Sequence, residues 1–283
     1  MNSWATPPPA LDDCILNVPS PHVLLVTLNR PKRMNSIPYA LHWQLEALWS
    51  WFDDEPSLRV AIITGAGNKS FCAGSDLIEI DKVNTAKQSG QVDAEPWKHS
   101  HPKSGFAGLS RREGRKPIIA AVNGFALGGG MEIVLNCDMV IASPTASFGL
   151  PEAQRGLYAS GGGLPRLLRT VGLPVASDIA LTGRRFSVEE ARECHLINRI
   201  AKSSESLLRE AVEIANSIAA ISPDAIVVTR AALREAWETA SVERAFQLTH
   251  ARFDSRLMKG FNAKEGLAAF KEKRPPRWQG SKL

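Results

Sequence analysis

Short apolar runs separated by glycine and proline dominate the first two thirds of the chain. Runs rich in β-branched and aliphatic residues predict short strands, at 14–18, 23–29, 59–64 and 118–122. Between the second and third of these, apolar side chains recur every three or four positions from Leu41 to Phe52, which predicts an amphipathic helix. Pro38 suits the first turn of that helix, and Pro56 ends it.

The last third of the chain changes to helical periodicity. Helices are predicted at 174–182, 188–194, 204–220, 223–238, 241–258 and 262–273, with one short strand near 196–201. Strand–turn–helix units followed by helices predict an α/β core with a helical C-terminal module. Several of these helices carry apolar stripes that a single core does not cover, which indicates contacts between subunits.

This pattern divides the chain into four parts. Residues 1–12 are rich in proline and predict a flexible leader. Residues 13–202 form the predicted core, and residues 203–274 form the helical module. Residues 275–283 are a predicted tail ending in Ser281, Lys282 and Leu283, which spell a peroxisomal targeting signal read by an import receptor.

Composition narrows the class of protein. A hydrophobic content of 44% in 283 residues is ample for a core, and no run approaches the roughly 18 apolar residues of a membrane span. The N-terminus lacks a signal-peptide pattern, and the four cysteines form no C-x-x-C pair, which argues against secretion, disulfides and zinc ribbons. The net charge of +5 comes from interspersed basic residues, which favours a small polyanionic ligand over nucleic acid.

The segment 116–152 holds the densest chemistry. The predicted strand at 118–122 ends at a turn, and Gly128, Gly129 and Gly130 then begin a helix whose free N–H groups form an anion-binding site. Glu132 follows in an apolar context, and Glu152 follows a rigid proline. Each glutamate alone is explained by a helix-capping role, but two carboxyl groups beside an oxyanion site favour acid–base chemistry at a carbonyl.

A second loop, at 71–77, follows the strand at 59–64. The preceding G-x-G suggests dinucleotide binding, but Ser70 stands where the third glycine belongs, which excludes that motif. The small residues of the loop instead allow a ligand to lie against the backbone, with the N–H of Ser75 at a helix start.

Residues 82–113 show no sustained hydrophobic period. His99 and His101 lie there without acidic or cysteine partners, so no metal site is predicted.

Three motifs carry a family resemblance that spans roughly residues 14–275. They read LNRPKRMNS at 28–36, RVAIITGAGNKSFCAGSDL at 59–77, and AAVNGFALGGGMEIVLNCDMVIAS followed by ASFGLPEAQRGL and GGGLPRL. Together they closely resemble the enoyl-CoA hydratase/isomerase (crotonase) family. The resemblance implies a spiral of repeated β-β-α units with a helical trimerisation module. Ser75 departs from the family's usual alanine, and Tyr158-Ala159-Ser160 departs from its Pro-Gly-x-Gly-Gly pattern.

The resemblance also implies an activity and a site. The expected enzyme is an acyl-CoA hydratase in which Ser75 and Gly129 form the oxyanion hole, Glu132 activates water for attack at C3, and Glu152 protonates C2. Neither a metal nor a cofactor is expected, because coenzyme A is part of the substrate. The residues expected to contact CoA or the acyl group are Lys32, Ala73, Ser75, Asp76, Leu77, Phe270 and Lys273.

Several alternatives stay open at this point. A Δ3,Δ2-enoyl-CoA isomerase is the second candidate, although it commonly lacks one of the two acids, and another acyl-CoA enzyme of the same family, such as a hydrolase or a lyase that keeps both acids, is also an alternative. An inactive scaffold or an RNA-binding member of the fold is the non-enzymatic alternative. The acyl group is not determined: straight-chain substrates are the default, and branched or hydroxylated ones, such as mevalonyl-CoA in siderophore side-chain assembly, are alternatives. We expect a homotrimer or a dimer of trimers in the peroxisome matrix.

Overall fold

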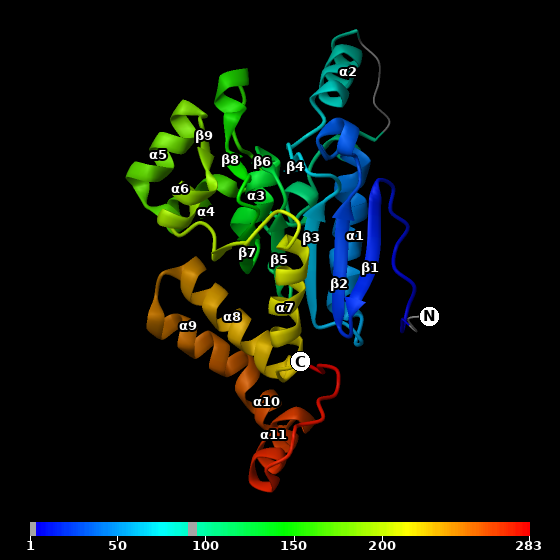
Figure 1. The fold of residues 1–283 in the computed structure, drawn as a ribbon, viewed down its shortest axis with the longest axis vertical. Helices are drawn as coiled ribbons and strands as arrows, with labels where there is room; N and C mark the ends of the chain where they lie inside the picture. The colour runs from blue at the N-terminus through cyan, green and yellow to red at the C-terminus, as the bar shows by residue number, and fades with distance from the viewer. Residues whose placement is uncertain (1–3, 90–94) are drawn as a thin grey trace.

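Two β-sheets form the centre of the computed structural model, which describes residues 4–89 and 95–283 (Figure 1). The larger sheet has the order β1 (Cys14–Ser20), β2 (Val23–Leu28), β3 (Val60–Gly65), β5 (Ile118–Val122), β7 (Met139–Ala142) and β10 (Arg199–Ile200). The smaller sheet has the order β4 (Ser70–Cys72), β6 (Phe125–Leu127), β8 (Ser147–Gly149) and β9 (Arg185–Ser187). Only the β1–β2 and β8–β9 pairs are antiparallel among these strands.

The chain alternates between the two sheets. Three successive strands of the large sheet, β3, β5 and β7, are each followed by a strand of the small sheet, β4, β6 and β8. Helix α2 (Leu77–Gln88) follows the first pair, α3 (Gly129–Asn136) the second, and the short helix η4 (Pro151–Arg155) the third. This arrangement confirms the predicted α/β spiral of repeated units. The short strands β4, β6, β7, β8 and β9 and most of α2 were not predicted.

Helices cover both faces of the large sheet. Alternate residues of β2, β3 and β5 pack with the apolar side of α1 (Tyr39–Asp54), and the residues between them pack with α7 (Leu207–Ala219). Every residue of β3 and β5 is buried, as is typical of a parallel sheet covered on both sides. The continuous apolar runs that predicted these strands are therefore the centre of the core.

Helices dominate the chain after η4, as predicted. They are α4 (Gly163–Val171), α5 (Leu173–Thr182), α6 (Val188–Glu193), α7, α8 (Pro223–Thr239), α9 (Val242–Thr249), α10 (Ser255–Lys259) and α11 (Phe261–Glu272). The predicted helix at 241–258 contains a π-helical turn, His250–Asp254, between α9 and α10. Among the described residues no single helix has the length and apolarity to cross a bilayer; α7 and α8 meet those criteria only jointly, across a bend of 105°.

Both ends of the described chain lie against the body of the protein. Near the N-terminus, the Trp51 indole donates to the Thr6 carbonyl at 3.0 Å, and the Ala5 N–H donates to Glu55 at 2.9 Å. The described part of the predicted leader, residues 4–12, is therefore held on α1. At the other end the Trp278 indole donates to the Ala220 carbonyl at 2.9 Å, so the predicted tail also packs on the protein.

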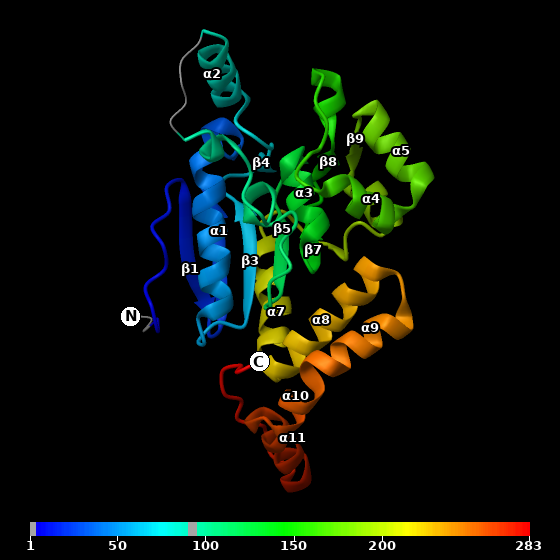
Figure 2. The same cartoon turned by 180° about the vertical axis from the view of Figure 1, so that it is seen from behind.

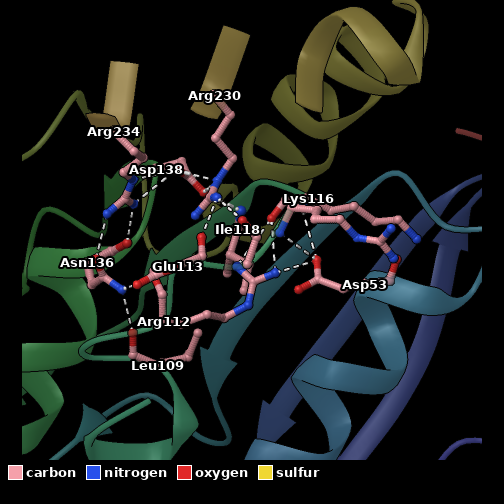
Figure 3. A network of polar contacts seen from close by, with 12 residues as sticks. Asp53, Leu109, Arg112, Glu113, Lys116, Ile118, Asn136, Asp138, Arg230 and Arg234 are labelled. Carbon is pink, nitrogen blue, oxygen red and sulfur yellow. Dashed lines mark hydrogen bonds and ion pairs between the residues drawn. The ribbon is translucent and has the colours of Figure 1, made fainter. Parts of the chain in front are cut away.

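A buried polar network joins the helical module to the spiral (Figure 3). Asp138, at the start of β7, accepts from Arg230 at 2.9 and 3.0 Å and from Arg234 at 2.9 Å, both on α8. The same carboxylate accepts the Ile118 N–H at 2.9 Å. These arginines hold the pKa of Asp138 below its ordinary value against the effect of burial. One carboxylate therefore ties α8 to two neighbouring strands.

Candidate active site

The small sheet brings three distant loops to one edge. Because β4 pairs with β6 and β6 with β8 in parallel, the loops that follow these strands emerge side by side. The first loop carries Ser75, the second Gly129 and the third Glu152. Sequence reasoning identified all three residues. The short strands that bring them together were missed.

The first backbone donor is the N–H of Ser75. The Ile37 N–H donates to the Gly74 carbonyl at 2.9 Å, and the Ile37 carbonyl accepts from the Asp76 N–H at 3.1 Å. Ile37 and Ser75 thus form a parallel bridge, in which Ser75 stands between the two residues that bond to Ile37, Gly74 and Asp76. In such a bridge the N–H of the middle residue points to the opposite side of its strand. Ser75 therefore directs its N–H away from Ile37. The serine side chain does not alter this backbone donor.

The second backbone donor is the N–H of Gly129, the first residue of α3. The first N–H groups of a helix have no partner within the helix and carry its positive dipole end. A Cβ placed on Gly74 would lie 3.2 Å from the Gly129 nitrogen, so the two loops touch through bare backbone. A Cβ on Gly130 would lie 2.1 Å from the Cys72 carbonyl oxygen, so Gly130 is required by packing between α3 and β4.

Glu132 is the first of the two carboxylic acids, and it does not cap its own helix. Its side chain accepts a hydrogen bond of 2.8 Å from the Gly163 N–H, at the start of α4. The residue is only 2% exposed. Burial raises the pKa of Glu132 to about 7, the neighbouring Glu152 contributes in the same direction, and the N–H groups of Gly163 and Gly161 oppose both. Such a group exchanges protons near neutral pH.

Glu152 is the second acid, held in the first turn of η4 after Pro151. Its Oε2 is buried and has no hydrogen-bond partner in the described part of the protein. A Cβ placed on Gly128 would lie 3.1 Å from its Oε1, so the carboxyl group lies over the start of α3. Burial raises the pKa of Glu152 above its ordinary value. A buried acid without a partner beside an oxyanion site is typical of a catalytic group.

Phe106 is a site residue that sequence reasoning missed. A Cβ on Gly129 would lie 2.4 Å from the Phe106 ring, and a Cβ on Gly161 would lie 3.0 Å from the Phe106 Cβ and 2.7 Å from Glu132 Oε2. The ring, which is 1% exposed, therefore packs behind both the oxyanion donor and the first acid and supports them. Its position depends on a turn in which Ala107 has φ 57, and no sequence signal marks that turn.

The other predicted contact residues divide into two groups. Ala73, Asp76 and Leu77 lie in the Ser75 loop or at the start of α2. Lys32 is exposed in the turn before Asn35. The Asn35 amide donates to the carbonyls of Ala66 and Ser70, which precede the Ser75 loop. Asp76 has a structural task there. Its carboxylate accepts from Arg30 at 2.9 Å and from two N–H groups of α2, which hold its pKa below the ordinary value.

Phe270 and Lys273 form the second group. They lie at the end of α11, at the opposite end of the molecule from α2 and away from α3, as both views show (Figures 1 and 2). The Phe270 side chain is 87% exposed. A single chain therefore does not bring these two residues to the site. Within the described ranges, no three His, Cys, Asp or Glu side chains are arranged to hold a metal ion.

Two backbone donors beside one buried and one partly buried acid, on a spiral of β-β-α units, are suited to stabilising negative charge on a carbonyl oxygen while protons are exchanged. The chain belongs to the enoyl-CoA hydratase/isomerase family, whose profile matches residues 20–281. It is a member of the crotonase fold and an acyl-CoA hydro-lyase of that family.

Similar proteins agree with this assignment. The chain is 48% identical over 275 residues to a mevalonyl-coenzyme A hydratase of Aspergillus fumigatus, covering 97% of this chain and 98% of the relative. A carnitinyl-CoA dehydratase of Proteus mirabilis is 38% identical, with 91% and 95% covered. The crystal structure of the Bacillus anthracis enoyl-CoA hydratase superposes with a TM-score of 0.83 at 33% identity, covering 95% of this chain and all of that one.

Proposed function

We propose that this chain interconverts mevalonyl-CoA and its dehydrated 2-enoyl-CoA product. The observation that carries the proposal is the pair of acids beside the backbone donors: Glu132 is buried, and Glu152 is partly buried with an Oε2 that has no partner among the described residues. The acyl group is supported by the near full-length similarity to mevalonyl-coenzyme A hydratases of Aspergillus fumigatus and Beauveria bassiana, each 48% identical. Mevalonyl-CoA carries hydroxyl groups at C3 and C5 and a methyl group at C3.

The dehydration uses one proton shared by the pair of acids. Glu152, ionised, takes a proton from C2 while negative charge moves to the thioester oxygen, which the N–H groups of Ser75 and Gly129 bind. Glu132, protonated, gives its proton to the C3 hydroxyl as the C–O bond breaks and water leaves. Hydration is the reverse, in which Glu132 takes a proton from water and Glu152 protonates C2.

The raised pKa of Glu132 suits this division of roles. With a pKa of about 7, Glu132 still holds a proton near neutrality, as the acid of the dehydration must. Adding or removing water changes no oxidation state, so the chemistry needs no redox cofactor, and we assign no cofactor besides the CoA of the substrate.

Two other candidate functions fit the site less well. An isomerase moves one proton between two carbons and needs only one of the two acids. A scaffold or RNA-binding protein needs neither, and burying two carboxyl groups without a role costs stability. Hydration is therefore the function that accounts for both side chains.

Subunit contacts complete the proposed CoA site. Phe270 is 87% exposed, Phe246 62% and Leu267 69%, and apolar side chains exposed in this way on α9 and α11 support a trimer or a dimer of trimers. In that assembly α11 of one subunit places Phe270 and Lys273 at the nucleotide of its neighbour's ligand, opposite Lys32.

Lys273→Ala should then weaken binding of acyl-CoA several-fold and leave binding of the acyl-pantetheine unchanged. Equal effects on both thioesters would contradict this role.

The last three residues, Ser281, Lys282 and Leu283, address the protein to the peroxisome in this proposal. In the folded chain the Lys282 N–H donates to Asp224 at 3.2 Å, and the Leu283 carbonyl accepts from Arg115 at 3.0 Å. An import receptor would have to displace these contacts. A fluorescent protein fused ahead of residues 274–283 should enter peroxisomes and should stay outside them when Leu283 is deleted.

The test of the activity is a hydration assay followed at the absorbance of the conjugated thioester. Purified protein is offered crotonyl-CoA, a long-chain 2-enoyl-CoA and 5-hydroxy-3-methylpent-2-enoyl-CoA. We expect the highest kcat/KM with the hydroxylated, branched substrate. A preference for either straight chain would overturn the proposed acyl group, and no turnover of any of the three would overturn the activity.

A further inference from the structure

Phe106 belongs to a cluster of aromatic and imidazole rings beside the site. The ring centres of Phe106 and His42 are 4.5 Å apart, those of His42 and His101 are 4.8 Å apart, and those of His101 and Phe106 are 5.6 Å apart. Because Phe106 contacts Gly129, this cluster borders the region next to the thioester. The mechanism uses neither histidine.

His42 has a structural task in the cluster. It is 1% exposed, and its Nδ1 accepts a hydrogen bond of 2.9 Å from the Ala107 N–H. A ring nitrogen that accepts from a backbone N–H carries no proton, so the proton of His42 is on Nε2. Burial lowers the pKa of His42 to about 3, and the ring is neutral. His42 therefore fixes the turn that positions Phe106.

Unlike His42, His101 has no hydrogen-bond partner for its ring nitrogens among residues 4–89 and 95–283. The ring is half-buried, and in the described part of the chain it makes ring contacts with His42 and Phe106 but no hydrogen bond. Burial lowers its pKa below the ordinary value, which leaves it neutral at pH 7. A neutral imidazole has one donor and one acceptor nitrogen, the complement of a hydroxyl group.

His101 lies near enough to the oxyanion donor for the far end of a short hydroxylated acyl chain to be considered as its partner, because both His101 and Gly129 contact Phe106. When the thioester oxygen lies between Ser75 and Gly129, C3 lies between the two acids, and the acyl chain extends beyond C3. Three bonds separate C3 from the C5 hydroxyl oxygen, so that oxygen lies about 4 Å beyond C3, and a hydrogen-bond partner lies about 2.8 Å further. His101 and the oxyanion donor Gly129 share one neighbour, the Phe106 ring, whose centre is 5.6 Å from that of His101.

We propose that His101 determines specificity by exchanging a hydrogen bond with the terminal hydroxyl group of the acyl chain, while the buried Phe106 ring holds His101 beside the site. The inference rests on the proposed function, since it assumes a hydroxylated acyl group. It adds the residue that recognises the hydroxyl. Tyr158, which is 71% exposed, is less suited to that task because its hydroxyl group competes with water.

The experiment compares two substrates that differ by one oxygen atom: 5-hydroxy-3-methylpent-2-enoyl-CoA and 3-methylpent-2-enoyl-CoA. The wild-type protein should hydrate the hydroxylated substrate with the higher kcat/KM. His101→Phe keeps an aromatic ring and removes both polar nitrogens, so the preference should fall by about 10- to 100-fold, the range for one unpaired polar group in a binding site. The rate with the deoxy substrate should not fall with it, since that substrate makes no hydrogen bond to His101 that the substitution could remove.

Two further variants separate recognition from packing. His101→Gln keeps a donor and an acceptor and should recover part of the preference. His99→Phe changes the neighbouring histidine of the same segment and should leave the preference unchanged. Equal loss with both substrates in His101→Phe, or a preference that survives that substitution, would overturn the role of His101 alone. A wild-type protein without the preference would overturn the proposed acyl group, and the inference with it.

Discussion

The carboxylate of Glu132 accepts a hydrogen bond from the Gly163 N–H at 2.8 Å, so the first acid of the site is held by the start of α4 and not by its own helix. A helix N-terminus stabilises negative charge, but burial has the larger effect and raises the pKa of Glu132 to about 7. The hydrogen bond fixes the position of the carboxyl group, and the burial sets its protonation near neutral pH.

We predict a pH profile whose alkaline limb lies near pH 7. The reaction needs one proton in the pair of acids, and above a pKa of about 7 Glu132 loses it. The acidic limb should lie above pH 4.5, because the pKa of Glu152 is raised from that value. The measurement is kcat/KM for hydration between pH 4 and 10. A rate that keeps rising above pH 8 would contradict the assignment.

The stability of Glu132→Gln relative to the wild type should increase with pH. The folded pKa of Glu132, about 7, lies above the ordinary value of 4.5, so the folded state binds the proton more tightly, and wild-type stability falls as pH rises between these values. At 1.36 kcal/mol per unit this amounts to about 3 kcal/mol. Denaturant unfolding at pH 5 and pH 8 measures it. A difference independent of pH would show that Glu132 is not held in the protonated form.

Replacing Glu152 by Gln should remove activity and leave the fold intact. The side chain has a buried Oε2 with no partner in the described structure, so an amide of the same shape breaks no protein hydrogen bond. Loss of one acid or base lowers kcat by about 10²–10⁴-fold, and KM should change little. The kinetics are read beside a thermal unfolding curve. Less than a tenfold loss of kcat would remove Glu152 from the mechanism.

A methyl group on Gly161 should disable the site by displacing Glu132. Its Cβ would lie 2.7 Å from Glu132 Oε2, and a shift of about 1 Å in a catalytic group can cost about 10²-fold in rate. Gly156→Ala is the control, because Gly156 has φ 69 and no atom within 4 Å of the added Cβ. The control should lose about 1 kcal/mol of stability through backbone strain and keep its kcat. Similar activities in the two variants would rule out the displacement.

Asp138→Asn should destabilise the whole chain. Asp138 is the shared partner of Arg230, whose side chain is 7% exposed, and of Arg234. Removing one member of a buried pair costs about 3–5 kcal/mol. The matched control is Glu213→Gln, which breaks a pair with Arg209 in which both side chains are 61% exposed and should cost at most about 0.5 kcal/mol. Chemical denaturation compares the two, and equal midpoints would refute the structural role of the network.

The sequence predicts the elements that depend on local pattern. Strands β2, β3 and β5 of the large sheet are continuous apolar runs, and α1 has a clear helical period, so these elements were predicted, whereas β7, with four residues, was not. The small sheet was missed because β4, β6 and β8 are three residues each, too short to show a period. Helix α2 was largely missed because no residue of it is buried, which leaves no apolar stripe.

The residues of the candidate site likewise divide into those that a local motif predicts and those that only long-range contacts place. Ser75, Gly129, Glu132 and Glu152 stand in motifs with local geometry, and the structure brings their loops together. Phe106 and His101 lie where the sequence shows no period, and their positions depend on contacts with His42 on α1. The packing of the tail depends on partners such as Asp224, which is 58 residues from Lys282. Contacts between distant segments of this kind leave no trace in a single sequence.

The two backbone donors of the oxyanion hole have a consequence for how the chain refolds. Ser75 follows β3 and β4 along the chain, and Gly129 follows β5 and β6. The two loops do not meet until β3 has formed hydrogen bonds with β5, and β4 with β6. Helices can form locally in microseconds, whereas pairing between distant strands is slow. A refolding chain should therefore regain helical circular dichroism before it regains activity, and the return of turnover marks the end of folding.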